Sequence, residues 1–155
     1  MVTVRKARSS DAAGILACLS AAFAPFENSY TKEAYSDTVL TMKTLQERLR
    51  SMTLFIAVSA AGGVAGTIGC AKVDEQEGHL RGMAVLPEWQ GTCIAAQLLE
   101  RAEFELRHLG CRRVSLDTTA PLKRAVQFYK RHGYQPTGRV TDFFGMKLFE
   151  YSKNL

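Results

Sequence analysis

The chain lacks the cysteine patterns that mark metal centres and disulfide scaffolds. It has 155 residues and four cysteines, no two of which form a CxxC pair. No histidine lies at ligand spacing from a cysteine, so the sequence predicts no metal site. Cys18 and Cys70 stand among apolar residues and are predicted to be reduced core thiols, which favours a cytoplasmic location.

Concentrated positive charge is also missing. The 20 Lys and Arg exceed the 15 Asp and Glu by five, but the basic residues are dispersed and occur at most in pairs such as Arg112-Arg113 and Lys123-Arg124. Nucleic-acid binding usually needs a concentrated basic surface, so we expect no nucleic-acid partner. A basic protein that binds nucleic acid stays a rival interpretation, recognisable by salt-dependent binding to DNA.

Long apolar runs are absent as well, and no stretch reaches the length that we expect of a membrane span. Basic residues precede a small-residue apolar stretch near the N-terminus, as in a signal peptide. Asp11 interrupts that pattern, and Ile15, Leu19 and Phe23 recur at helical spacing. We therefore expect residues 1–155 to form a single domain with no membrane partner.

The hydrophobic periodicity predicts a mixed α/β fold, a single twisted sheet with helices on both faces. The order is β-α-α-β-β-β-α-β-α-β-β. The strands are expected at 2–7, 53–59, 64–73, 79–86, 111–117, from Tyr134, and at 146–151, and the helices at 11–23, 32–50 (broken near Thr41), 91–109 and 121–133. A loop is expected at 24–30, and the three strands of 53–86 are expected to form an antiparallel meander.

The most informative stretch is 83–99, where a strand turns into a long helix. Pro87 ends the strand, because proline cannot donate to a sheet ladder. The helix that follows opens with small residues, which would let a ligand approach the backbone. The first amides of a helix have no internal partner, and with the helix dipole they form an anion site suited to a pyrophosphate.

The same stretch resembles motif A of the GNAT acetyltransferase superfamily, in which Gln or Arg is followed by spaced small residues. Gln90 and Ala95 fit the pattern, whereas Cys93 stands where glycine is usual. A second segment resembles motif B of that superfamily, with its matches at Ala125, Tyr129, Gly133 and Tyr134. Leu122 occupies a position where the family often has Asn. The resemblance implies the acyltransferase fold over nearly the whole chain.

The resemblance further implies an N-acetyltransferase that uses acetyl-CoA and needs no metal. The backbone of the strand before the helix is expected to pair with the pantetheine amides, in the manner of an added strand. The expected cofactor-binding residues are Met83, Ala84, Val85, Gln90, Gly91, Thr92, Cys93, Ile94, Ala95, Ala96 and Tyr129. The departures at Cys93 and Leu122 keep open an alternative, a non-catalytic protein that binds acyl-CoA as a sensor or regulator.

Two residues are candidates for proton transfer. The motif B tyrosine, Tyr129, is assigned by the resemblance to the departing sulfur as the acid; the alternative is a core tyrosine bonded to a carbonyl. His79 is the candidate base, because imidazole titrates near neutrality and arylalkylamine acetyltransferases carry a histidine at this spacing. The alternative is a solvated histidine at a strand end. Glu77 and Asp117 are reserve candidates that are expected to face water.

Alternation along the strand places His79, Arg81, Met83 and Val85 on one face, and a β-bulge would break that register. Arg81 could bind an acidic group of the acceptor or lie on the surface. Cys93 is expected in the first turn of the helix, where the dipole lowers a thiol pKa, so it could be redox-sensitive or simply narrow the loop in place of glycine.

The acceptor is expected to be a small amine rather than a protein, and a homodimer is left open. Aromatic residues near the expected acceptor site would suit a hydrophobic or aryl amine, although each could equally pack in the core. They are Phe23, Phe26, Tyr30, Tyr35, Phe143 and Phe144.

Overall fold

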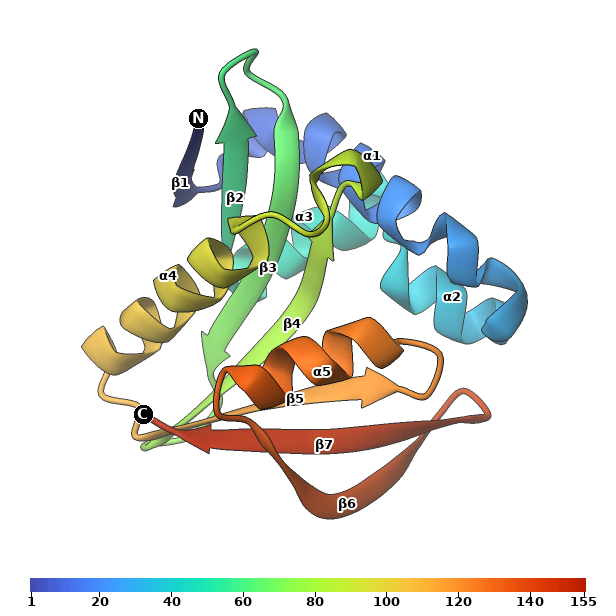
Figure 1. Ribbon diagram of the computed structural model, residues 1–155, viewed down its shortest axis with the longest axis vertical. Coiled ribbons are helices and arrows are strands. Elements are labelled where there is room, and N and C mark those ends of the chain that lie inside the picture. The colour runs from blue at the N-terminus through green and yellow to red at the C-terminus, as the bar shows by residue number, and fades with distance from the viewer.

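A computed structural model describes residues 1–155 and shows one seven-stranded sheet (Figure 1). The strand order is β1-β2-β3-β4-β5-β7-β6. The pairing of β4 with β5 is parallel, and every other pairing is antiparallel. The strands are β1 (Val2–Lys6), β2 (Thr53–Ser59), β3 (Val64–Lys72), β4 (Glu77–Val85), β5 (Arg113–Thr119), β6 (Gln135–Phe143) and β7 (Met146–Asn154).

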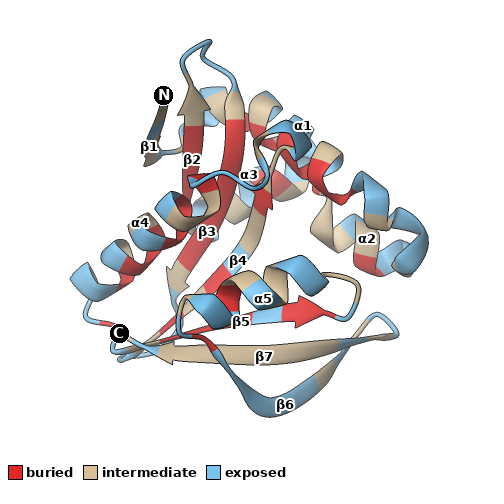
Figure 2. Ribbon diagram, viewed as in Figure 1, coloured by how far each residue is buried: buried red, intermediate tan, exposed pale blue.

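Helices cover both faces of the sheet, as the sequence predicted. Two apolar clusters result, and Figure 2 shows their buried residues along the central strands. One cluster joins the sheet to α4 and includes Leu98 and Leu106; the other joins it to α1 and α3 and includes Ile15 and Leu45. The helices are α1 (Ala12–Phe23), α2 (Lys32–Thr38), α3 (Met42–Ser51), α4 (Ile94–His108) and α5 (Lys123–Arg131).

Several boundaries differ from the prediction. The expected loop 24–30 is instead a 3-10 helix, Ala24–Ser29, that continues α1. The break near Thr41 is confirmed: its side chain accepts from the amide of Thr44 and caps α3. The strand expected to begin at His79 begins at Glu77, and the helix expected from Gly91 begins at Ile94.

The N-terminal helical run corrects one expectation. Residues Ser9–Ser29 form a helix long and apolar enough, by length and composition alone, to cross a membrane. Its apolar side chains Ile15, Cys18 and Leu19 are buried against the sheet and α3. Core helices of globular domains pass the same test, so this run is weak evidence for a span.

A β-bulge in β4 decides which face each of its side chains occupies. The register with β3 shifts between Thr67 and Gly69, opposite the β4 residues 81–84. Leu80 therefore packs in the α4 cluster, whereas Ala84, an even number of positions later, packs in the α1 cluster. Met83 and Val85 pack on the α4 side. The simple alternation that placed them on the face of His79 and Arg81 is thus wrong.

Candidate active site

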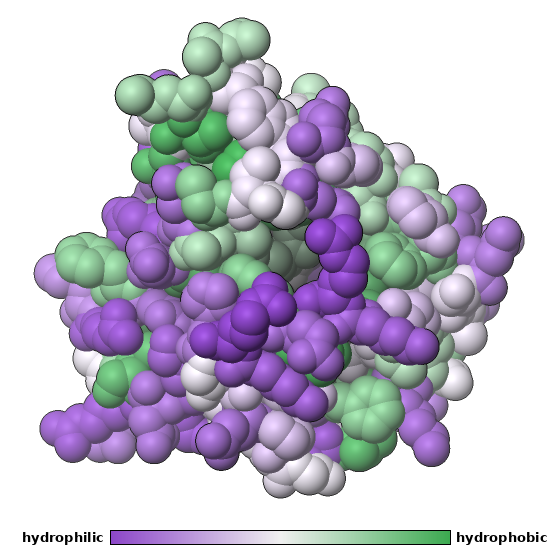
Figure 3. Space-filling view, in the orientation of Figure 1, coloured by the Kyte–Doolittle hydropathy of each residue, from purple (hydrophilic) through white to green (hydrophobic).

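The site lies where β4 and β5 separate. These parallel strands pair only over Glu77–Leu80 and Arg113–Leu116. Beyond that point a cavity of about 370 Å³ opens between them. The walls are residues 79–83 of β4, residues 116–119 of β5, and side chains from α1, α2, α3, α5 and the β6–β7 hairpin. Figure 3 shows a hollow near the centre of the face that carries α5, with hydrophilic residues along its right and lower margins.

His79 lies in this cavity, within a polar group that the strand pairing brings together. Its Nδ1 shares a hydrogen bond with the Oγ of Ser115, its register partner on β5, at 3.0 Å. Its Nε2 lies 3.6 Å from the Oδ2 of Asp117. Burial lowers the pKa of His79, and the nearby carboxylate of Asp117 opposes this effect. The histidine is therefore a half-buried group inside a strand, not a solvated residue at a strand end.

Asp117 was expected to face water, and its side chain does keep 32% exposure. It also lines the cavity, where burial raises the pKa of its carboxyl and His79 opposes that effect. Glu77 lies outside the cavity, in an ion pair with Arg113. Of the two reserve candidates, the structure thus brings Asp117 and not Glu77 to His79.

Tyr129 projects from α5 into the same cavity. The residue is 8% exposed, and its hydroxyl has no hydrogen-bond partner in the chain, whereas the neighbouring Tyr134 donates to Glu103 at 2.6 Å. The alternative of a core tyrosine bonded to a carbonyl is therefore not what the structure shows. Burial raises the pKa of Tyr129, so the phenol stays protonated near neutral pH and is available as a donor.

The predicted anion site lies at the start of α4, beside the open edge of β4. Five backbone amides there donate to no group of the chain: those of Gly91, Thr92, Cys93, Ala95 and Ala96. The amide of Ile94 makes one long contact with the Oγ1 of Thr92, at 3.4 Å. Such a run of free donors at a helix N-terminus suits a multiply charged oxyanion.

The loop and the strand at this site are tied together. The Nε2 of Gln90 donates to the carbonyl of Val85 at 3.0 Å, so this side chain fixes the loop instead of projecting toward a ligand. Beyond Leu80 no strand pairs with the β5-facing side of β4, so the backbone of Met83–Val85 is unpaired along that side apart from the Val85 carbonyl, which Gln90 occupies. The exposed face of α5 carries Lys123, Arg124, Lys130 and Arg131.

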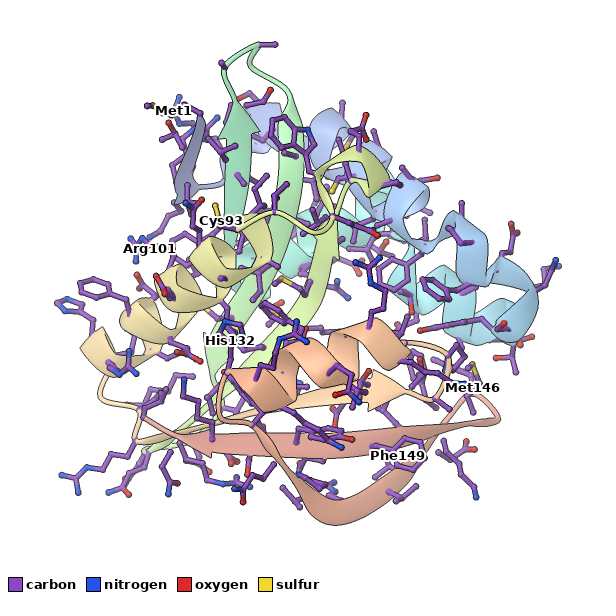
Figure 4. The ribbon with its side chains drawn as sticks, in the orientation of Figure 1. Met1, Cys93, Arg101, His132, Met146 and Phe149 are labelled. Atoms are coloured by element: carbon purple, nitrogen blue, oxygen red, sulfur yellow. The ribbon has the colours of Figure 1, made fainter.

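Cys93, labelled in Figure 4, is the N-cap of α4 and is exposed, whereas the other three cysteines are buried. All four are free thiols. The structure contains no cluster of three or more His, Cys, Asp or Glu side chains that could hold a metal ion.

The aromatic residues near the acceptor side divide into two groups. Phe23, Tyr30 and Phe143 line the cavity. Phe26 and Tyr35 instead pack against the α1 cluster, and Phe144 is exposed at the tip of the β6–β7 hairpin. Leu122, at the family's Asn position, also lines the cavity and offers it no hydrogen bond.

One cavity residue was missed by the sequence prediction. Arg48 reaches the site from α3, alongside Arg81 of β4. The guanidinium of Arg81 binds Asp37 at 2.7 Å, whereas Arg48 has no ion pair within the chain. Arg48 occurs in an ordinary amphipathic helix, and only the position of α3 against the β4 bulge would have revealed it.

Comparison with known proteins supports one family. The family model described as "Acetyltransferase (GNAT) family" matches residues 16–134. An aminoglycoside N(6')-acetyltransferase type 1 from Stenotrophomonas maltophilia is 29% identical over 106 residues, covering 61% of this chain and 67% of the relative. N-alpha-acetyltransferase MAK3 from Arabidopsis thaliana is 29% identical over 93 residues, covering 57% of this chain. The matched region spans 49% of that plant protein, about half its length.

Among solved structures, the PaiA N-acetyltransferase from Thermoplasma acidophilum, in complex with coenzyme A, superposes with a TM-score of 0.81. The two chains share 18% identity, and the superposition covers 100% of this chain and 99% of the other. At that identity the likeness shows the fold, whereas the family model covers more than half of the sequence. On these grounds the chain belongs to the acetyltransferase (GNAT) family.

Proposed function

We propose that this protein transfers the acetyl group of acetyl-CoA to a primary amine of a small molecule. The observation that carries the proposal is a single cavity that holds both His79 and Tyr129, together with the unpaired amides of α4 that follow β4 in the chain. The first residue supplies a proton acceptor and the second a proton donor. The free amides supply a binding site for an anion.

The residues present fit a coenzyme A ligand. The amides of residues 91–96 would hold its pyrophosphate, and the basic face of α5 suits its further negative charge. The open edge of Met83–Val85 would take an extended amide chain as an added strand. When bound, the cofactor supplies an acetyl group already activated as a thioester.

The residues of the cavity perform the proton transfers. An amine attacks only when neutral, so a base must accept a proton from it. His79 suits this role because burial lowers its pKa and keeps the imidazole neutral and ready to accept. Ser115 fixes its ring orientation, and Asp117 would stabilise the imidazolium that forms. The hydroxyl of Tyr129 would donate to the departing sulfur.

Several features support the finer parts of the proposal. A cavity of about 370 Å³ matches the size of small-molecule sites, which supports a small acceptor over a protein segment. An unpartnered hydroxyl on Tyr129 favours catalysis over simple acyl-CoA sensing, because a purely structural tyrosine would have its own partner. Four free thiols support the proposed cytoplasmic location.

The proposal is tested by calorimetric titration with acetyl-CoA, followed by turnover with a panel of amines. We expect micromolar binding, weakened at least about tenfold in Thr92→Asp, because a carboxylate beside the free amides repels phosphate. Thr92→Asn is the neutral control and should bind normally. No binding at millimolar acetyl-CoA would overturn the proposal. Binding with no turnover on any amine would favour the sensor interpretation.

A role for His79 is tested with a matched pair of variants. His79→Gln should lower kcat about 100-fold or more, the usual contribution of a general base. His108→Gln, at the exposed end of α4, should leave kcat unchanged. Equal activity of the two variants would remove His79 from the mechanism.

A further inference from the structure

We infer that the acceptor amine carries a carboxylate or a similar oxyanion, which Arg48 binds inside the cavity. The inference rests on the proposed function and adds the chemical class of the second substrate. It starts from a half-buried charged side chain that the fold leaves without a partner.

Arg48 has no counterion of its own. It lines the cavity, yet no carboxylate of the chain lies within ion-pair distance of its guanidinium. Asp37 is the one carboxylate whose charge affects the pKa of Arg48, and that carboxylate is already bound by Arg81. Buried charges in proteins are normally paired, because an isolated charge loses its hydration without compensation.

Partial burial acts on the charge of this guanidinium. It lowers the pKa of Arg48 to about 10, and the neighbouring charge of Arg81 adds to the effect. The group remains a cation at neutral pH. An oxyanion entering the cavity would therefore meet a positive charge that is partly stripped of water, where ion pairing is strongest.

A glycine in β4 lets the Arg48 side chain lie close to the strand. Gly82 lies in the β4 bulge with a φ of +69°, a conformation that residues with a side chain rarely adopt. A Cβ at Gly82 would come within 3.0 Å of the Arg48 Nη1. Glycine thus allows both the bulge and the close approach of the guanidinium to the β4 backbone.

The remaining walls describe the rest of the ligand. The amine must reach His79, while Phe23, Tyr30 and Phe143 offer aromatic surface to an apolar body. Planar guanidinium groups bind carboxylates through two parallel hydrogen bonds, which gives both affinity and orientation. A ligand that can contact His79, the aromatic residues and Arg48 at the same time is a small amine with an apolar body and an oxyanion, as in an apolar amino acid.

The test compares three probes that share one aromatic body: phenylalanine, phenylalaninamide and phenethylamine. We expect the carboxylate probe to have a kcat/KM at least about tenfold above the two probes that lack a carboxylate, the size of a charge-assisted hydrogen-bond contact. In Arg48→Gln this preference should vanish, mainly through a higher KM. Arg48→Lys should keep part of it, and Arg50→Gln, on the exposed side of the same helix, should keep all of it.

A binding measurement separates this inference from the proposed function. N-acetylphenylalanine and its amide are titrated into wild type and Arg48→Gln, with no turnover required. If wild type prefers the carboxylate ligand and Arg48→Gln does not, the inference is supported. This holds even if no amine is acetylated, because that result would overturn only the proposed function. Equal binding of the two ligands to wild type, or the same preference in Arg48→Gln, would overturn it.

Discussion

Replacing Tyr129 with Phe separates catalysis from stability more cleanly than any other single change. The substitution removes one hydroxyl that has no partner in the chain, so no hydrogen bond is lost and no buried group is orphaned. We therefore expect the free energy of unfolding to change by less than about 0.5 kcal/mol. A proton donor to the departing sulfur typically contributes about 100-fold in rate. We expect kcat to fall by that order with acetyl-CoA affinity nearly unchanged.

Tyr134→Phe is the matched control, because it removes the same atom from a neighbouring ring. The Tyr134 hydroxyl donates to the buried carboxylate of Glu103, which also pairs with Lys153 at 3.1 Å. Loss of this charge-assisted bond should cost about 1.5 to 3 kcal/mol of stability. Its kcat should stay near the wild-type value, since the hydroxyl points away from the cavity into that buried pair.

The assays are chosen to keep the two effects apart. Turnover is followed by loss of thioester absorbance, because a thiol reagent would also react with the exposed Cys93. Stability is taken from urea unfolding and cofactor affinity from calorimetry. If Tyr129→Phe turns over as fast as wild type, the proposed donor role is wrong. If its stability falls as far as that of Tyr134→Phe, the hydroxyl is a structural group instead.

Three further predictions follow from the structure. Since burial lowers the pKa of His79 below its ordinary 6.5, kcat/KM should rise with pH and level off with a midpoint below 6.5; a midpoint above that value contradicts the assigned environment. A maleimide should label the exposed Cys93 first, because burial raises the pKa of Cys18 and Cys70 to about 12. Acetyl-CoA should slow this labelling, which mass spectrometry measures. A labelling rate that acetyl-CoA does not change would place the anion site elsewhere. Gly78→Ala should lower the free energy of unfolding, measured in urea, by about 1 to 3 kcal/mol, because the new Cβ would lie 2.7 Å from the Leu106 methyls. Gly63→Ala is the control and should unfold like wild type, because its Cβ would have no contact under 3.7 Å.

The order of elements could be read from the sequence because each depends on local signals. Periodicity located the strands and helices, and the expected break near Thr41 is where the structure separates α2 from α3. The free amides at the start of α4 were also predictable, because they follow from where a helix begins. Boundaries were less certain, since tertiary packing continued α1 into a 3-10 helix at 24–29.

The acceptor side of the site could not be predicted in the same way. Asp117 reaches His79 only because β4 and β5 pair in parallel with His79 opposite Ser115, and a sequence does not state that register. Alternation along β5 would have placed Ser115 and Asp117 on one face, which was the available signal. Arg48 enters through the packing of α3 against the bulge, a contact between segments far apart in the chain.

The bulge at Gly82 makes this protein unequally tolerant of different genetic changes. One extra residue shifts the phase of β4 by half a period, so Leu80 and Ala84 reach opposite faces. Flattening the bulge with every residue kept would turn Met83 and Val85 to the face of His79 and drive Ala84 into the α4 cluster, whereas deleting the extra residue would leave all three on their present faces. A substitution at Gly82 that removes the bulge would thus alter one wall of the site and one hydrophobic cluster together. Substitutions elsewhere around the cavity change single side chains, whereas a substitution at Gly82 changes the orientation of several.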